Sequence, residues 1–356
     1  MKISKTWMLT GLAIALGVVS AGAQTGTTST PPKATTPAPA TNAAPKTAAP
    51  APPPLHLNDL GQTSRPDPFP PVNLKYFTAP SPTVNTVDSF LKALWGYDEN
   101  RIWRVEAIQK TGAPGVSKVV VFVSDRTPNA KVQTTAFFVT PDGNHAIAGD
   151  GVIPFGATPF APARKLLEEQ ADGAARGATS KDLLLVEFAD LECPHCKDAQ
   201  GTMDQLAKDF PNARIVFQSF PLVQIHPFAF KAAAYGYCVE KQKNDAFFTY
   251  ASAVFDNQAA LTEQTGDATL KNAVTKAGLD PGTIDLCAAT QATKDQVNAS
   301  IKLAEEVGVN QTPMLSINGR LVPITNVPYE TLKKIVSYQA QMDGVGTGGA
   351  TTPATR

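Results

Sequence analysis

Two cysteines stand two residues apart in the segment LECPHCKDA, residues 191–199, and their types and spacing suit redox chemistry. Cys193 and Cys196 flank a Pro-His pair, after an apolar run and at the start of a helical pattern. A helix N-terminus carries unpaired N–H groups and a partial positive charge, which favour a thiolate at the first cysteine. Pro194 suits the first helical position, where its missing N–H removes no hydrogen bond. The spacing predicts a dithiol in which Cys193 attacks and Cys196 resolves.

Two other uses of this cysteine pair remain open at the level of the motif. Cys-x-x-Cys is half of a zinc site, for which His195 and His226 offer further ligands, and it also occurs as an inert staple. The other cysteines, Cys238 and Cys287, lie far apart in the chain and form no second Cys-x-x-Cys pair. We therefore favour the redox interpretation and expect no metal and no other cofactor.

The elements around the dithiol follow a strand–helix–strand order. LLLVEFA, residues 183–189, is almost wholly apolar, as expected for a buried parallel strand. Residues 194–209 have a helical pattern, and ARIVFQSF, residues 213–220, predicts the second strand. The Asn-Gly pair in MLSINGRLVPI, residues 314–324, is a strong signal for a β-hairpin. This order predicts an α/β domain that places the dithiol after its first strand.

Helical patterns fill the long stretch between the second strand and the hairpin. In TKDQVNASIKLAEEVG, Thr293 and Gln296 form a capping-box pattern, and Gly308 supplies a stop signal. PYETLKKIVSYQAQM predicts a last helix after the hairpin.

The first residues of the chain indicate export. Lys2 and Lys5 give a positive start, residues 9–19 are apolar, and Ala21-Gly22-Ala23 is a small-residue cleavage site. We expect a signal peptide, residues 1–23, that is removed after Ala23, because its apolar stretch is too short to cross a bilayer comfortably. Retention as a membrane anchor is the alternative. A periplasmic or otherwise exported chain lives where disulfides persist.

The charge balance excludes one class of partner. Without the two lysines of the leader, the 31 basic residues become 29 against 31 acidic ones, a formal charge of −2. This balance gives no indication of a nucleic-acid surface, and no later segment is apolar for long enough to span a membrane. We expect no nucleic-acid partner.

Composition divides the rest of the chain. Residues 24–83 hold half of the thirty prolines and predict a disordered Pro/Ala/Thr-rich linker. Residues 84–160 combine an amphipathic helix pattern with three β-branched runs, which predicts a small α+β domain. Residues 161–179 predict a linker helix, residues 180–343 the domain that carries the dithiol, and residues 344–356 a disordered tail.

The segment VEFADLECPHC resembles the active site of the DsbA family of thioredoxin-fold oxidoreductases, which characteristically carries Cys-Pro-His-Cys. The resemblance continues through IVFQSFPL and HPFAFKAAAYGYC to GVNQTPMLSINGR. It implies an α/β thioredoxin fold with an inserted helical domain at about residues 224–308, preceded here by the small α+β domain. It further implies a protein that donates disulfides to reduced exported proteins and is reoxidised by a membrane partner.

The resemblance also implies roles for individual residues. Pro313 matches a cis proline that faces the dithiol, and Thr312 would offer backbone groups to an extended substrate strand. His195 would stabilise the thiolate by a hydrogen bond or by charge, with a merely solvated histidine as the alternative. Glu187 matches a buried acid that would take the proton of the second cysteine, with a bystander acid as the alternative.

Related proteins often carry a structural disulfide in the helical insertion. Cys238 and Cys287 lie in helical patterns there, so the resemblance implies that they pair, and two free buried cysteines are the alternative. In the entropy model such a loop would stabilise the fold by about 4 kcal/mol.

A second resemblance keeps another function open. FFVTPDGNHAIAGDGVIPF weakly resembles the end of the dimerisation domain of DsbC- and DsbG-type isomerases, whose linker helix residues 161–175 would supply. It implies a homodimeric isomerase or reductase that acts on misfolded exported proteins. A non-catalytic module that binds peptides near Thr312 and Pro313 is a third possibility. We favour the oxidase.

Overall fold

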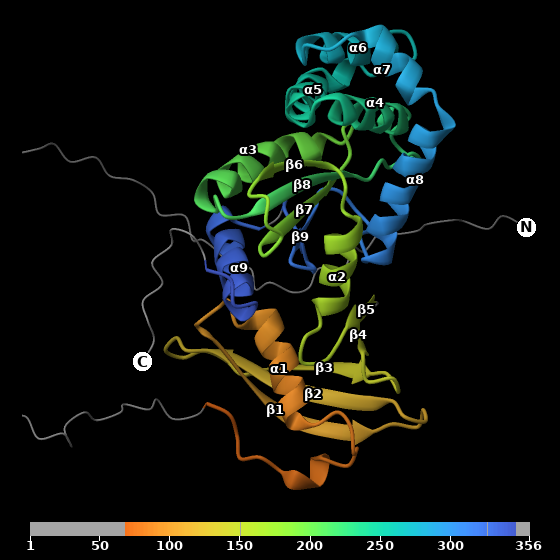
Figure 1. The fold of residues 1–356 in the computed structure, drawn as a ribbon. Coiled ribbons are helices and arrows are strands. Elements are labelled where there is room, and N and C mark those ends of the chain that lie inside the picture. Colours follow the sequence, from red (N-terminus) through yellow and green to blue (C-terminus); the bar gives the residue numbers. More distant parts are fainter. Residues whose placement is uncertain (1–67, 150, 326, 347–356) are drawn as a thin grey trace, which may run out of the picture. The chain divides into compact units, whose positions relative to one another are not determined.

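The computed structural model describes residues 68–149, 151–325 and 327–346. The predicted signal peptide, residues 24–67 of the predicted linker and the tail from residue 347 lie outside the described residues. Two five-stranded sheets, both within the compact unit Pro71–Arg356, organise the described part of the chain (Figure 1). None of the helices in these residues has the length and apolarity that crossing a bilayer requires.

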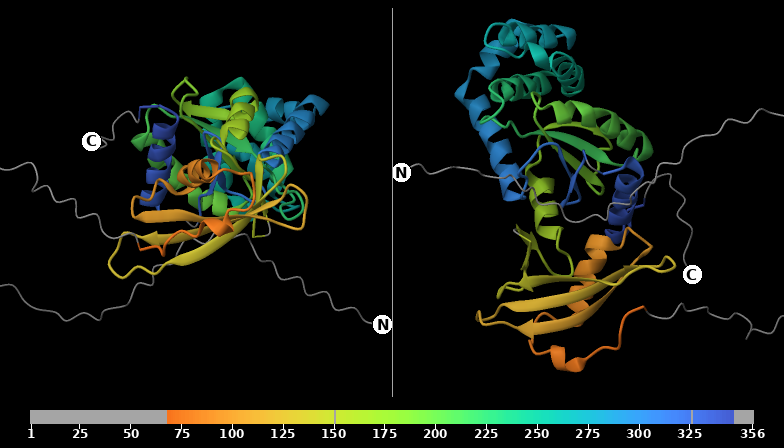
Figure 2. Two further views of the ribbon diagram at one scale, coloured as in Figure 1. Left: turned by 90° about the horizontal axis from the view of Figure 1, so that it is seen from below. Right: turned by 180° about the vertical axis from the view of Figure 1, so that it is seen from behind.

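The first sheet is an antiparallel meander with the strand order β1-β2-β3-β4-β5. Helix α1 (Val84–Trp95) lies across one face of it (Figure 2). Thr83 caps this helix, since its Oγ1 accepts the N–H of Thr86 at 3.1 Å. Val87 and Phe90 of α1 are buried in one cluster with side chains of the sheet. The strands are β1 (Arg101–Lys110), β2 (Ser117–Asp125), β3 (Gln133–Val139), β4 (His145–Ala148) and β5 (Gly151–Pro154).

Ordered structure begins earlier than the proline content predicts. The described residues that we assign to the linker include the short 3-10 helix η2 (Leu74–Tyr76). The N–H groups of Thr78 and Ala79 both donate to the carbonyl of Ile108 in β1, at 2.9 and 3.0 Å. The prediction of a disordered linker up to residue 83 is therefore wrong at its end, because backbone pairing with a distant strand orders a segment of poor local propensity.

The second sheet is mixed, with the strand order β10-β9-β7-β8-β6. Only β7 and β8 run parallel to each other; the other pairs are antiparallel. Helices α3 (Pro194–Asp209) and α9 (Tyr329–Met342) pack on one face, and α2 (Ala161–Gln170) with α8 (Gln291–Glu306) on the other. This confirms the predicted α/β fold of thioredoxin type. The strands are β6 (Ala174–Gly177), β7 (Leu184–Ala189), β8 (Arg214–Ser219), β9 (Met314–Ile317) and β10 (Arg320–Pro323).

The predicted linker helix is shorter than expected. Helix α2 ends at Gln170, and Ala174–Gly177 form the edge strand β6, paired antiparallel with β8. Residues 161–179 are therefore not a continuous helix, and the second sheet begins before residue 180. Of the four β6 residues only Ala174 is buried, so the local sequence carries little strand signal and the pairing with β8 defines the strand.

Five helices form the insertion after β8, and α4 to α7 gather in one helical group (Figure 1). Tyr235, Phe247 and Tyr250 are buried at its centre. The helices before α8 are α4 (Ala229–Gln242), α5 (Asn244–Asp256), α6 (Gly266–Lys276) and α7 (Pro281–Ala288), with the 3-10 turn η3 (Gln258–Ala260) after α5.

The cap of α8 differs from the predicted capping box. The helix begins at Gln291, and the side chain of Thr290 accepts the N–H of Thr293 at 3.2 Å. Thr293 lies in the first turn and donates its hydroxyl to the carbonyl of Cys287. Thr290 caps better because its extended backbone precedes the helix, whereas Thr293 is already helical.

The predicted hairpin joins β9 to β10. Asn318 and Gly319 both have positive φ, 47° and 89°, as a two-residue turn of this type requires. A Cβ on residue 319 would lie 2.3 Å from the carbonyl oxygen of Phe160, so a glycine is needed there for space as well as for conformation.

Candidate active site

The dithiol lies where β7 passes into α3. Strand β7 is buried along its whole length and ends at Ala189. Cys193 is the N-cap residue of α3, and Pro194 occupies the first helical position. Both sulfurs are free and both cysteines are buried, Cys196 completely. The helix start predicted for this motif is therefore present, with the first cysteine at the positive end of the helix dipole.

The two thiols have opposite ionisation. A hydrogen bond from the thiol of Cys196 is the largest of the causes that lower the pKa of Cys193 to about 5, with contributions from Thr312 and from the backbone N–H groups of Cys196 and His195. Burial raises the pKa of Cys196 far above its ordinary value, and the neighbouring Cys193 raises it further. The pair is therefore a thiolate next to a thiol that resists ionisation.

The loop before β9 faces this pair. The peptide bond between Thr312 and Pro313 is cis, and the sulfur of Cys193 lies 3.9 Å from the carbonyl oxygen of Thr312. The hydroxyl Oγ1 of Thr312 is buried and has no hydrogen-bond partner of regular geometry among the described residues. The structure thus brings together residues 193 and 312, which are far apart in the sequence.

His195 does not adopt the predicted side-chain contact. Its ring is 69% exposed, and Nδ1 lies 4.0 Å from a carboxylate oxygen of Asp198. Its contribution to the thiolate of Cys193 comes from its backbone N–H. A ring at the first turn of a helix points outward into solvent unless a partner holds it, which a sequence motif does not reveal.

Glu187 is a buried acid in the middle of β7. Burial raises the pKa of its carboxyl to about 7, against the opposing hydrogen bond from Gln200. The Nε2 of Gln200 donates to Oε1 of Glu187 and to the carbonyl oxygen of Cys196, both at 2.9 Å. The described contacts therefore connect the acid to the backbone of Cys196 through Gln200. Nothing in the sequence distinguishes Gln200 from an ordinary helical glutamine.

A side chain of the insertion also holds the dithiol loop. Gln258, in η3, donates to the carbonyl oxygens of Leu191 and Cys193 at 3.0 and 2.9 Å. The separation of 65 residues and more between these partners explains why the sequence offers no signal for this contact.

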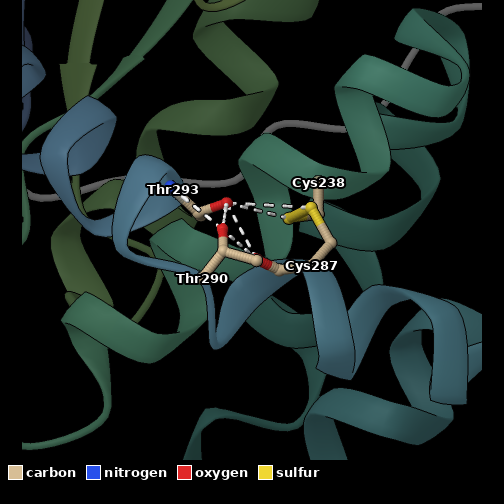
Figure 3. The surroundings of a disulfide bond; sticks show 4 residues. All are labelled: Cys238, Cys287, Thr290 and Thr293. Carbon is tan, nitrogen blue, oxygen red and sulfur yellow. Dashed lines mark hydrogen bonds between the residues drawn. A yellow bond between two sulfur atoms is a disulfide. The ribbon is translucent and has the colours of Figure 1, made fainter.

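Cys238 and Cys287 form a disulfide with a Cα–Cα distance of 6.0 Å, which joins α4 to α7 (Figure 3). Thr293 of α8 lies beside it, with its hydroxyl 3.6 and 3.7 Å from the two sulfurs. In the part of the chain that the structure describes, no group of three or more His, Cys, Asp or Glu side chains could hold a metal ion. The potential zinc ligand His226 instead contacts Asp190.

Residues 169–337 match the family model Thioredoxin_4, described as thioredoxin. The matched segment contains the second sheet, the free cysteine pair and the cis-proline loop. Fold and site together define the class of this part of the chain: a thioredoxin-like domain with a free Cys-x-x-Cys pair beside a cis-proline loop. Residues 169–337 of this chain therefore carry a thioredoxin domain, placed after an antiparallel five-stranded domain.

Several solved structures are similar to about half of the chain. A periplasmic thioredoxin-like protein from Salmonella enterica serovar Typhimurium is 22% identical with a TM-score of 0.43, over 51% of this chain and 97% of that one. BdbD from Bacillus subtilis is 20% identical with a TM-score of 0.43, over 48% and 93%. The thiol-disulfide exchange protein alpha-DsbA2 from Wolbachia pipientis is 20% identical with a TM-score of 0.42, over 49% and 95%.

Similarity to curated proteins is confined to part of each relative. The Na(+)/H(+) antiporter NhaA 1 of Mycolicibacterium vanbaalenii is 32% identical over 147 residues, which are 40% of this chain and 23% of the antiporter. NhaA 3 of Salinispora tropica is 27% identical over 145 residues, 41% of this chain and 21% of the antiporter. The chain thus spans less than a quarter of the length of these relatives.

Proposed function

We propose that this protein is an exported oxidase that introduces disulfides into secreted proteins through Cys193 and Cys196. The observation that carries the proposal is the placement of the pair: Cys193 caps α3 and Cys196 is fully buried beside it, and the hydrogen bond from Cys196 lowers the pKa of Cys193 to about 5. A stabilised thiolate is a good leaving group, and its stability in the reduced form makes the disulfide an oxidant.

The reaction follows from this asymmetry. In the oxidised form a substrate thiolate attacks the sulfur of Cys193, the bond to Cys196 breaks, and Cys196 takes the electron pair and a proton. A second substrate thiolate then attacks the substrate sulfur of the mixed disulfide and releases Cys193 as a thiolate. The substrate gains one disulfide and the protein gains two electrons, which an electron acceptor at the membrane would remove.

The other proposed residues act around this exchange. The backbone of Thr312, before Pro313, would pair with an extended substrate segment beside Cys193. Glu187 would exchange a proton with Cys196 through the protein interior, next to Gln200. His195, when protonated, would add positive charge near the thiolate from its exposed position.

Reoxidation of reduced, unfolded ribonuclease tests the proposal. The full-length oxidised protein should restore ribonuclease activity faster than buffer alone, and Cys193→Ser should abolish the gain because no mixed disulfide can form. A Cys193→Ser protein that still accelerates reoxidation would contradict the assignment. A non-catalytic peptide binder would give no acceleration with either form.

A second function is favoured by one observation, the five-stranded domain ahead of the thioredoxin domain. If that domain pairs two copies, the protein would be an isomerase or reductase whose dithiol is kept reduced. The reduction potential separates the two: about −120 mV indicates a strong oxidant and about −270 mV a reductase. Sedimentation of the full chain would report the oligomeric state.

A further inference from the structure

Asp190 is the first residue after β7, and its buried carboxylate accepts three hydrogen bonds. It is 1% exposed. Its Oδ1 accepts the N–H of Glu192 at 2.7 Å, and its Oδ2 accepts the N–H of Leu222 and Nδ1 of His226, both at 2.8 Å. These donors come from its own loop and from the loop between β8 and α4, so one side chain joins two loops beside the dithiol.

The backbone of Asp190 contacts both cysteines of the dithiol. Its N–H donates to the sulfur of Cys196 at 3.3 Å, and its carbonyl accepts the N–H of Cys193 at 3.1 Å. Three bonds to the carboxylate fix the orientation of the residue, and therefore the direction of the N–H that points at Cys196.

The loop opposite Asp190 is held at a second point. Oε2 of Glu192 accepts the N–H of Phe228 at 2.7 Å. Asp190 and His226 are both close enough to act electrostatically on the carboxylate of Glu192. The ring of His226 is mostly buried, at 17% exposure, so its bond to Asp190 is shielded from solvent.

The sulfur of Cys196 needs such a donor during the reaction. Burial strongly opposes its thiolate, and the groups that favour the thiolate are the N–H of Asp190 and the side chain of Thr312. Cys196 carries the electron pair at the moment when a substrate thiolate attacks Cys193 and the bond between the two cysteines breaks. Any group that fixes the donor therefore lowers the barrier for departure of Cys196.

We propose that Asp190 and His226 form a positioning pair that holds the N–H of Asp190 on the sulfur of Cys196 and thereby stabilises the departing Cys196 thiolate. The inference rests on the proposed function, because it concerns the first step of disulfide donation. Both residues are proposed to act through the sulfur of Cys196. Their effect is on the rate of that step and not on the thiolate of Cys193.

The test measures this step alone. Oxidised full-length protein is mixed with a reduced peptide that has one cysteine, and the mixed disulfide is counted by acid quench and mass spectrometry. His226→Phe removes the donor to Asp190 but keeps a ring, and Asp190→Asn keeps the shape of the acceptor. Both should slow formation of the mixed disulfide about tenfold, as expected for loss of a hydrogen bond to a charged group.

A matched control and a second readout separate this role from a loss of structure. His145 and Asp142 form a similar pair in the first domain, with Nδ1 2.6 Å from the carboxylate, so His145→Phe should leave the rate unchanged. The rate at which iodoacetamide alkylates Cys193 in the reduced protein, followed against pH, should be the same in all four proteins. If the Asp190→Asn protein does not fold, the result for His226→Phe alone decides whether the positioning pair exists.

Two results overturn the inference while leaving the proposed function intact. One is a mixed-disulfide rate in His226→Phe within twofold of the unaltered protein. The other is an alkylation profile of Cys193 that shifts together with that rate, which would mean that the pair supports the whole site. If the unaltered protein forms no mixed disulfide, the proposed function itself fails, and the inference with it.

Discussion

At the scale of single residues, Cys193 and Cys196 differ because their surroundings differ. Cys193, at the start of α3, faces the thiol of Cys196 and the N–H groups of the first turn, whereas Cys196 is enclosed. The order of attack and resolution expected from the sequence thus has a physical basis in the first turn of α3. It also means that the thiolate of Cys193 depends on Cys196 being present as a donor.

The reactivity of Cys193 should therefore follow an unusually acidic titration. With a pKa lowered to about 5, chiefly by the hydrogen bond from Cys196, its alkylation rate should rise through pH 5 and level off above about pH 6. Cys196→Ala should move the inflection upward, because the largest stabilising bond is lost. Iodoacetamide kinetics from pH 3 to 9 measure both, and an inflection near 8.5 in the unaltered protein would contradict the site geometry.

Glu187 should make the protein less stable as pH rises. Its pKa is raised from 4.5 to about 7 by burial, so between these values the folded state holds a proton that the unfolded state has lost. Stability then falls through this window and stays lower above it. Glu187→Gln should remove the fall and be more stable than the unaltered protein at pH 8, by up to about 3 kcal/mol, but not at pH 4.

Urea unfolding at pH 4 and pH 8 checks this prediction. Glu169→Gln, on the exposed side of α2, is the matched control and should change neither midpoint. An equal effect of Glu187→Gln at both pH values would mean that the carboxyl is not the cause.

At the scale of elements, the sequence predicted those whose own residues carry the pattern. Strand β7 is apolar throughout, α3 starts at a Cys-Pro pair, and the Asn-Gly turn requires its hairpin. It did not predict β6, which has one buried residue and exists because β8 offers an unpaired edge. The roles of Gln200 and Gln258 were not predicted for the same reason, because only the folded chain brings them to their hydrogen-bond partners.

The disulfide of the insertion should matter for stability and not for chemistry. It closes a loop with a sequence separation of 49 between α4 and α7, so its removal should lower the free energy of unfolding by about 4 kcal/mol in the entropy model. The double variant Cys238→Ala/Cys287→Ala tests this in urea, with ribonuclease reoxidation as a second measurement. Loss of reoxidation at full stability would assign the pair a redox role instead.

At the scale of the whole molecule, a buried arginine connects the five-stranded domain to the thioredoxin domain. Arg320 in β10 is 7% exposed and donates to the carbonyl oxygens of Ala93 and Leu94, at 2.9 and 2.7 Å. These carbonyls belong to the last turn of α1, where helix acceptors have no partner within the helix. Tyr97 and Phe160 lie 5.2 and 5.6 Å from its guanidinium. A separation of more than 220 residues makes such a contact invisible to sequence patterns.

Arg320→Met should therefore destabilise the fold although it removes a costly buried charge. Burial lowers the pKa of the guanidinium to about 10, because little solvent reaches it. Without it the buried carbonyl of Ala93 and the half-buried carbonyl of Leu94 lose their donors, at about 1 to 3 kcal/mol each, while the methionine recovers part of the packing. A net loss of about 2 to 4 kcal/mol in urea unfolding is expected. Arg320→Lys should fall between, because one ammonium cannot reproduce the two-pronged donor.

The comparison variant is Lys302→Met on α8, where the side chain is 75% exposed and a change of less than about 0.5 kcal/mol is expected. If Arg320→Met unfolds at the same urea concentration as the unaltered protein, the two carbonyls must be hydrated and the contact with α1 contributes no net stability. If instead unfolding splits into two transitions, the contact of Arg320 with α1 is needed for the five-stranded domain and the thioredoxin domain to unfold together, and the hydrogen bond from Tyr338 to the carbonyl of Lys92 is not sufficient.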